Sequence, residues 1–147
     1  MSDQYGKLQL FLKKRGLSAT AQRRQVFEAL QYKEPQSMHE LWLACRQQLD
    51  RATMYRTITL FEKLGIVQKL QIGWKYKLEL SNAFQPHHHH LSCRQCAAII
   101  PLPEDDQLEN RLNQLAEAAS FRPEDHQIEI RGLCQKCQAK KLQVVTP

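Results

Sequence analysis

The sequence predicts an α+β protein with an N-terminal winged helix-turn-helix domain followed by a small β-α-β domain. Two observations lead to this prediction. The first half of the chain carries helix patterns with capping residues, followed by two short β-like runs. The second half carries a histidine run, two Cys-x-x-Cys pairs and an apolar helix stripe between strand-like segments. We expect the first domain at residues 1–80, a hinge linker at residues 81–86 and the second domain at residues 87–147.

The first two predicted helices are short. Residues 8–12 are rich in leucine, and Gly16 is placed to end the first helix. Thr20 is a candidate N-cap of the second helix, whose apolar residues recur at helical spacing. Residues 22–24 put two arginines into the first turn of that helix, where the helix dipole disfavours cations. We interpret these charges as contacts for phosphate.

The third and fourth helices carry clearer start signals. Ser37, with Glu40 three residues later, forms a capping-box pattern. Asp50 is a candidate N-cap for a fourth helix at residues 51–64, which Gly65 ends. On a helical wheel, the apolar stripe of this helix contains Met54, Ile58, Phe61 and Leu64. The opposite side contains Ala52, Tyr55, Arg56, Thr59 and Lys63.

The outer face of the fourth helix suits a helix that lies in the major groove of DNA. Arg56 has the donors to read guanine edges, and Tyr55 can press against a thymine methyl group. An ordinary solvent-exposed face is the alternative. Two β-like runs follow at residues 66–72 and 75–80, broken at Gly73, and they complete the winged helix-turn-helix pattern.

The second domain alternates strand and helix patterns. Leu91 and residues 97–102 are strand-like, and Pro103 ends the second of these runs. Acidic residues then begin a helix with an apolar stripe, and residues 126–131 alternate as a strand does. A unit of about sixty residues is too small to be secure alone, so we expect it to be stabilised by a structural metal and by self-association.

Two Cys-x-x-Cys pairs predict a structural zinc site. Tetrahedral Zn²⁺ is commonly bound by four thiolates, and the two-residue spacer lets both sulfurs of a pair reach one ion. Two disulfides and a thiol oxidoreductase are the alternatives. The chain has no export signal and no apolar run long enough to span a membrane, so we expect a cytoplasmic protein with reduced thiols. The four cysteines are Cys93, Cys96, Cys134 and Cys137.

The histidine run at residues 87–90 predicts a further metal site. Four sulfurs already complete the zinc tetrahedron, so the imidazoles are not needed there. A polyhistidine tag is usually longer and terminal, whereas this run is internal. The remaining alternative is a merely polar loop.

The charge is distributed unevenly along the chain. Residues 1–85 carry a balance of +7 and residues 86–147 a balance of −1, within a total of +6. A basic helical domain joined to a neutral domain rich in metal ligands suggests a phosphate-backbone partner for the first.

Several motifs taken together resemble the ferric uptake regulator family, which includes zinc, manganese and peroxide sensors. They are the run from Ala52 to Thr57, the pair Glu79-Leu80, the pattern His-His-x-His-Leu, the run Gly132-Leu133-Cys134 and the two Cys-x-x-Cys pairs. The resemblance extends from about Leu17 to Cys137. It implies a homodimer that binds palindromic double-stranded DNA operators when loaded with metal, and it leaves open a dimer of dimers.

The resemblance also implies roles for individual residues. The four cysteines would hold the structural zinc. One histidine-carboxylate site would comprise His87, His89, Glu109 and His126. A second, bridging site would comprise Glu79, His88 and His90. This division of the run agrees with a β-strand, whose successive side chains point to opposite faces. The expected DNA-binding residues are Lys14, Arg23, Ala52, Thr53, Tyr55, Arg56 and Thr59.

The sequence departs from the family pattern at several ligand positions. His89 stands where many members have aspartate, and Pro35 and Pro101 stand where a histidine and a glutamate are common. His39 can substitute for the ligand lost at Pro35; a solvent-facing histidine is the alternative. Nitrogen in place of oxygen favours zinc, whereas zinc sensors often have cysteine where this chain has Glu79. Aspartate ligands typical of peroxide sensors are absent, so peroxide sensing is the least expected function.

These observations predict a metal-dependent transcriptional repressor, not an enzyme. Iron is the regulatory metal that we favour, with zinc and manganese as alternatives. A zinc-uptake regulator of the same family is the second hypothesis. A zinc metalloenzyme is a remoter one, because it would need an open metal position, a general base and a substrate pocket.

Overall fold

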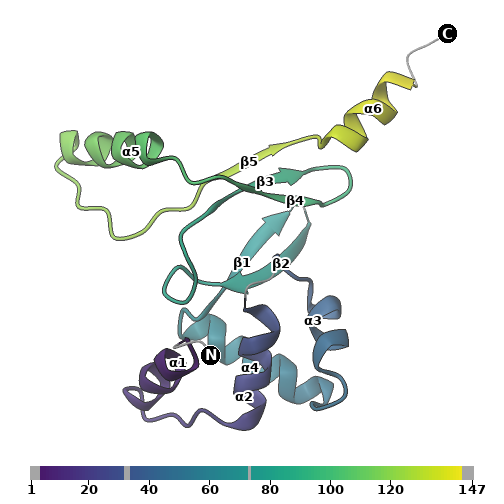
Figure 1. Cartoon of the computed structure of the whole chain (residues 1–147), viewed down its shortest axis with the longest axis vertical. Coiled ribbons are helices and arrows are strands. Elements are labelled where there is room, and N and C mark those ends of the chain that lie inside the picture. Colours follow the sequence, from purple (N-terminus) through teal and green to yellow (C-terminus); the bar gives the residue numbers. More distant parts are fainter. Residues whose placement is uncertain (1–3, 32–33, 73, 144–147) are drawn as a thin grey trace. The chain divides into compact units, whose positions relative to one another are not determined.

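The computed structural model describes residues 4–31, 34–72 and 74–143. The chain divides into two compact units, Met1–Pro86 (unit 1) and His87–Pro147 (unit 2) (Figure 1). The break predicted at Gly73 lies outside the described residues. None of the helices described for this chain is both long and apolar enough to cross a membrane. The mixture of helices and small sheets confirms the predicted α+β class.

Unit 1 has the winged helix-turn-helix order. Four helices are followed by an antiparallel hairpin in which Val67 pairs with Leu80 and Ile72 pairs with Lys75. The elements are α1 (Gln4–Lys13), α2 (Ala21–Leu30), α3 (Met38–Cys45), α4 (Arg51–Lys63), β1 (Val67–Ile72) and β2 (Lys75–Leu80).

The predicted caps start the helices of unit 1. The Thr20 side chain accepts from the backbone N–H of Arg23, at 3.3 Å, at the start of α2. Ser37 and Glu40 form a reciprocal capping box at α3. Asp50 Oδ1 accepts from the backbone N–H of the third residue of α4 at 2.9 Å. Glycines in the left-handed region follow α1 and α4, as the helix-ending prediction requires: Gly16 at φ +71° and Gly65 at φ +70°.

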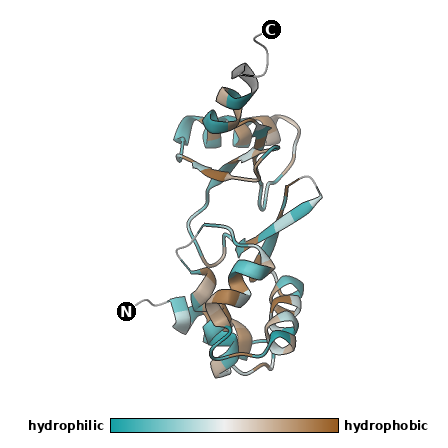
Figure 2. Ribbon diagram, turned by 90° about the vertical axis from the view of Figure 1, so that its right-hand side faces the viewer, coloured by the Kyte–Doolittle hydropathy of each residue, from teal (hydrophilic) through white to brown (hydrophobic). Residues whose placement is uncertain are grey.

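The core of unit 1 lies between the helices and one face of the hairpin. Figure 2 shows the hydrophobic colouring concentrated on the inner faces of its helices. Phe84 belongs to this core, because its ring lies edge-on to Phe11 at 5.3 Å and to Phe27 at 5.5 Å. The backbone N–H of Ser81 donates to the Ile66 carbonyl at 2.9 Å. The segment predicted as a hinge linker therefore packs onto unit 1.

A third strand-like segment joins the hairpin of unit 1. Gln36 and Leu78 form an antiparallel bridge, with N–H to carbonyl distances of 2.9 and 2.6 Å. The Gln36 side chain also donates to the Ala29 carbonyl at 2.7 Å. The sequence did not predict this bridge, which fixes the start of α3 against both α2 and the hairpin.

Unit 2 is a three-stranded sheet with two helices. Its strands lie in the order β4-β3-β5, with β3 antiparallel to β4 and parallel to β5. The C-terminal helix was not predicted. The elements are β3 (His89–Cys93), β4 (Ile99–Leu102), α5 (Asp106–Ala118), β5 (Glu129–Gly132) and α6 (Gln135–Gln143).

The apolar stripe that the sequence predicts for the helix of unit 2 is not fully buried. None of the residues of α5 is fully buried, and Leu115 is 52% exposed. Ile100, Phe121 and Ile130 are also large apolar side chains that remain exposed. An apolar surface of this kind is expected of a domain that associates with another copy of itself.

Candidate metal centres and DNA-binding surface

Four cysteines converge in unit 2 from three parts of the chain. Cys93 ends β3, Cys96 lies in the following turn, and Cys134 and Cys137 lie at the start of α6. All four sulfurs lie within 4.8 Å of one another, and Cys96 Sγ is 3.6 Å from Cys134 Sγ. A zinc tetrahedron with Zn–S bonds of about 2.3 Å has S···S edges of about 3.8 Å. All four are free thiols, and the spacing of their sulfurs fits a zinc site.

The thiol electrostatics also suit a cation. Backbone N–H groups of Cys134 and Cys96 point at the Cys93 sulfur and lower the pKa of that thiol to about 6. Burial and the neighbouring sulfurs raise the pKa of Cys137 to about 12. The Cys93 thiol is therefore easily ionised, whereas ionisation of the Cys137 thiol requires a positive charge nearby. A bound Zn²⁺ supplies that charge.

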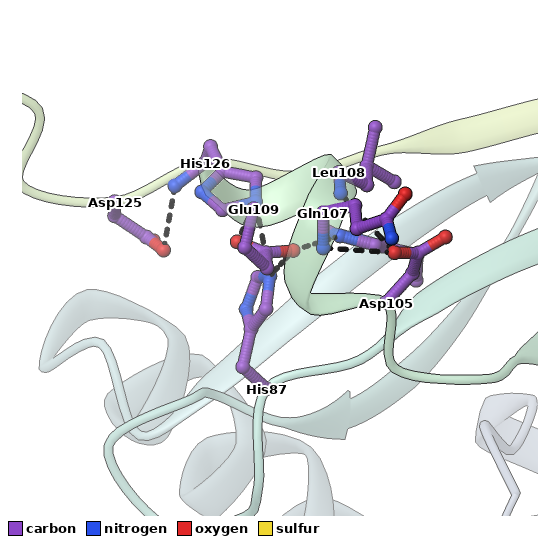
Figure 3. A network of polar contacts seen from close by, with 8 residues as sticks. His87, Asp105, Gln107, Leu108, Glu109, Asp125 and His126 are labelled. Atoms are coloured by element: carbon purple, nitrogen blue, oxygen red, sulfur yellow. Dashed lines mark hydrogen bonds and ion pairs between the residues drawn. The ribbon is translucent and has the colours of Figure 1, made fainter. Parts of the chain in front are cut away.

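Three imidazoles and one carboxylate form a second cluster within unit 2. Figure 3 shows His87, Glu109 and His126 converging from the segment before β3, from α5 and from the segment before β5. His87 Nε2 lies 3.1 Å from His126 Nε2, and His89 Nε2 lies 2.8 Å from Glu109 Oε1. The other carboxylate oxygen is 3.2 Å from His126 Nε2. Zinc bonds of about 2.0–2.1 Å to nitrogen and oxygen give edges of about 3.3 Å, so this donor set also fits an ion.

The protonation state of this cluster favours metal binding. Burial, followed by the neighbouring imidazoles of His126 and His89, lowers the pKa of His87. The hydrogen bond with His89 lowers the pKa of Glu109. His87 is therefore neutral and Glu109 ionised at neutral pH. These are the forms that bind a metal ion.

The histidines of the run alternate between two faces along β3 and the two residues that lead into it. His89 faces α5, where it meets Glu109. His90 pairs in register with Glu129 of β5, and the His88 and His90 rings lie 4.6 Å apart. On this second face, Glu129 accepts from Ser92 Oγ at 2.6 Å and from Arg131 Nε at 2.8 Å. Sequence reasoning did not single out this carboxylate, because the register that places it opposite the run is set by the pairing of β3 with β5.

The remaining predicted ligands lie in unit 1. Glu79 is on β2, where its carboxylate accepts from Gln68 Nε2 at 2.6 Å. The bridging site of Glu79 with His88 and His90 remains a prediction. His39 is exposed in the first turn of α3, and its ring stacks on Trp42 at 6.5 Å between centroids. Its role as a substitute ligand also remains a prediction.

The outer face of α4 is exposed as its pattern predicts. Tyr55 is 45% exposed, and Ala52, Arg56 and Thr59 are also exposed. Thr53 is half-buried; its Oγ1 donates to Asp50 at 2.6 Å and accepts from Arg56 Nη2 at 3.2 Å. These contacts hold the first turn of α4 and the Arg56 guanidinium in place.

Two predicted phosphate contacts lie outside α4. Lys14 is exposed just after α1, and Arg23 is half-buried in the first turn of α2, where it donates to the Ser18 carbonyl. A surface hollow between α2 and α4 is lined by Thr20, Arg23 and Arg56, among others. The fold thereby brings two arginines from separate helices to one concave surface.

Comparison with known proteins decides the family. A model of the ferric uptake regulator family matches residues 14–131. The chain belongs to the ferric uptake regulator family. It is 32% identical over 133 residues to the ferric uptake regulation protein of Legionella pneumophila, covering 86% of this chain and 96% of that one. It is 33% identical over 131 residues to that of Escherichia coli K12, covering 84% and 85%.

Solved structures of ferric uptake regulators share the fold. That of Helicobacter pylori, described as having three functional metal binding sites, aligns with a TM-score of 0.74 and 26% identity, over 92% of this chain and 91% of that chain. A zinc-bound manganese uptake regulator aligns with a TM-score of 0.61 and 26% identity, covering 87% and 98%.

Membership confirms the general function predicted from sequence. Ferric uptake regulator family proteins are metal-responsive, DNA-binding, dimeric transcriptional regulators, and they are not enzymes. The enzyme alternatives are therefore set aside.

Proposed function

We propose that this ferric uptake regulator family member is an iron-responsive repressor. It binds palindromic operators as a homodimer, and it acts in the cytoplasm. The four cysteines of unit 2 hold a structural Zn²⁺. Glu79, His88 and His90 hold the regulatory ion, and His87, His89, Glu109 and His126 hold a further one.

The division of the histidine run over two faces of β3 is the observation that supports this proposal most. His87 and His89 meet Glu109 on one face, whereas His88 and His90 are paired with each other on the other. A single site would use imidazoles from one face only. Two separate ligand sets permit one ion to stabilise unit 2 while another responds to metal supply.

The switch follows from which units supply the ligands. Glu79 comes from the winged helix-turn-helix unit, and His88 and His90 come from the dimerisation unit. When ligands from both units coordinate one ion, they restrict the orientations available to the two DNA-binding units of a dimer. Orientations with recognition helices one helical turn of DNA apart then gain population, provided that they bind the ion more tightly than the others do.

The ligand types favour iron at the bridging site. A carboxylate together with two imidazoles and open positions is a set that Fe²⁺ accepts, whereas zinc structural sites are closed. A zinc-responsive regulator is the second candidate, and His89 favours it: three nitrogens and one carboxylate at the other site suit Zn²⁺.

A metal titration tests the proposal. Protein that retains its cysteine-bound zinc is stripped of exchangeable metal and titrated with Fe²⁺, Mn²⁺ or Zn²⁺, and binding to a palindromic duplex is followed by fluorescence anisotropy. We expect Fe²⁺ to restore tight binding at the lowest free concentration. Restoration by Zn²⁺ at lower free concentration would favour the zinc regulator. Equal affinity with and without metal would refute the switch.

A further inference from the structure

Three side chains form a layered cluster beside the recognition helix of unit 1. The Arg51 guanidinium lies over the Trp42 ring, with Cζ 5.0 Å from the ring centroid. His39 lies near the same indole at 6.5 Å, with an angle of 27° between the rings. We call His39, Trp42 and Arg51 the α3–α4 stack. It joins the first turn of α3 to the first residue of α4.

The stack continues the DNA-facing surface of α4. Arg51, Tyr55 and Thr59 are spaced four residues apart, so they lie along one side of the helix. The Thr59 hydroxyl donates to the Tyr55 carbonyl at 3.0 Å, which marks the same line. Arg51 and His39 are exposed, and Trp42, whose ring lies near both, is half-buried. The exposed side of α4 thus extends onto α3 through one indole ring.

Among the residues that the structure describes, no carboxylate neutralises the charge of Arg51. No ion pair joins Arg51 to a carboxylate in the part of the chain that the structure describes. The acid next to Arg51 in sequence, Asp50, caps α4 by accepting from Thr53, and Glu40 of α3 accepts from the backbone N–H of Ser37 at 2.7 Å. Glu62, farther along α4, is paired with Lys69 at 2.9 Å. Arg51 is also the first residue of α4, where the helix dipole disfavours a cation.

We propose that the α3–α4 stack is a second DNA contact, in which Arg51 binds a backbone phosphate next to the groove that α4 reads. Trp42 holds the guanidinium in place by a cation–π contact, and the His39 ring extends the contact along α3. This assignment rests on the proposed DNA-binding function. It gives His39 a role at the DNA backbone in place of the metal-ligand role considered for it.

A phosphate contact has a signature that a structural role lacks. Each cation that neutralises a phosphate contributes about 0.9 to the slope of log K against log salt concentration. A residue that only supports the fold changes stability and leaves this slope unchanged. Because Arg51 is held over the Trp42 ring, we also expect the two residues to contribute jointly to the free energy of DNA binding. The effects of replacing them should therefore not be additive.

The test measures binding of metal-loaded, full-length protein to a palindromic duplex selected by the wild type from random DNA. We expect Arg51→Ala to weaken binding by about tenfold, in keeping with the loss of a charge-assisted hydrogen bond. The salt slope should fall by about 0.9 for each protomer. Arg46→Ala, which removes the same charge from the other end of α3, is the matched control and should leave the slope unchanged.

Trp42→Leu keeps apolar volume next to the core and removes the ring. We expect it to weaken binding severalfold alone and to add little to Arg51→Ala. A circular dichroism melt of each variant establishes that it is folded. His39→Ala should weaken binding at saturating metal and retain the full metal content. Loss of one metal equivalent in His39→Ala would instead make His39 a ligand and remove it from the stack.

The outcomes separate this inference from the function on which it rests. A folded Arg51→Ala protein that binds as tightly as the wild type, with the same salt slope, would overturn the stack as a DNA contact. An equal loss in Arg46→Ala would do so as well, because the effect would then be one of net charge. A metal-loaded wild type that binds no duplex would overturn the proposed function itself.

Discussion

The Nε2 atoms of His87 and His126 lie 3.1 Å apart, although the two residues are 39 positions apart in the sequence. Two imidazole lone pairs do not approach this closely unless a proton or a cation lies between them. Burial lowers the pKa of His87, which disfavours the doubly protonated form of its ring. The two nitrogens are therefore placed to bind a cation between them, and the Glu109 carboxylate supplies an anionic oxygen ligand 3.2 Å from His126 Nε2.

Replacing His126 should empty this histidine-carboxylate cluster selectively. In His126→Ala we expect one metal equivalent per chain to be lost while the cysteine-bound zinc remains, measured by elemental analysis after dialysis. The melting temperature in saturating zinc should fall, because an ion at about 100 times its dissociation constant stabilises the folded state by about 2.7 kcal/mol. A His126→Ala protein with undiminished metal content would contradict the assignment.

Removing one cysteine of the zinc cluster should unfold unit 2. Cys134→Ser leaves three thiolates, and we expect loss of the zinc together with the ellipticity of this unit, because structural zinc supplies folding free energy. Cys45→Ala is the matched control: Cys45 is 2% exposed in the core of unit 1 and should retain full zinc. Zinc retention by Cys134→Ser at wild-type affinity would argue against a four-cysteine site.

The packing of Phe84 predicts that the segment after the hairpin stabilises unit 1. Phe84 is 2% exposed and contacts two other rings, so Phe84→Ala should lower the free energy of unfolding by about 3–5 kcal/mol in urea titrations. Leu10→Ala removes an apolar side chain of unit 1 that is 62% exposed, and it should change stability by less than about 0.5 kcal/mol. Similar small effects from both would mean that residues 81–86 act as a free linker.

Asp50 should make unit 1 sensitive to acid. Hydrogen bonds from the Thr53 side chain and backbone hold the pKa of Asp50 below its usual range. Its ionised form therefore favours folding. This contribution is complete above the unfolded pKa of about 3.9 and is lost as the pH falls through the lower folded value.

Asp50→Asn tests this dependence because it keeps an acceptor at the cap and cannot ionise. We expect the wild type to be the more stable protein near neutrality and the two stabilities to converge below about pH 4. Tryptophan fluorescence follows the unfolding, since Trp42 and Trp74 both belong to unit 1. Asp105→Asn, at the start of α5, should leave this signal unchanged. If the difference in stability between the wild type and Asp50→Asn were the same at every pH, Asp50 would not titrate in this way.

Local signals in the sequence were sufficient to predict the helices of unit 1. Thr20, Ser37 and Asp50 are caps because each side chain reaches a backbone N–H two or three residues ahead, a contact that needs no tertiary structure. The two glycines after α1 and α4 act for an equally local reason, their positive φ. The alternation of the histidine run was likewise predictable from strand geometry alone.

The features that were missed depend on distant contacts. Phe84 joins the core only because α1 and α2 present rings to it, and Gln36 forms a β-bridge only because Leu78 lies opposite it. The helix α6 was missed because its sequence is dominated by glutamine and lysine and has no clear apolar stripe. The α3–α4 stack joins residues 39 and 51, whose meeting is set by the turn between two helices and by no pattern within either.

The alternation of imidazoles along β3 and the residues that lead into it makes the number of histidines before Leu91 critical. Counted back from Leu91, the four histidines point in turn to the side of Glu129 and to the side of Glu109. Removing one histidine would leave histidine at the three positions nearest Leu91 and would move Pro86 into the place of His87. The Glu109 side would then lose one donor, whereas the side of His88 and His90 would keep both. The first histidine of the run is therefore the one whose place depends on the exact count.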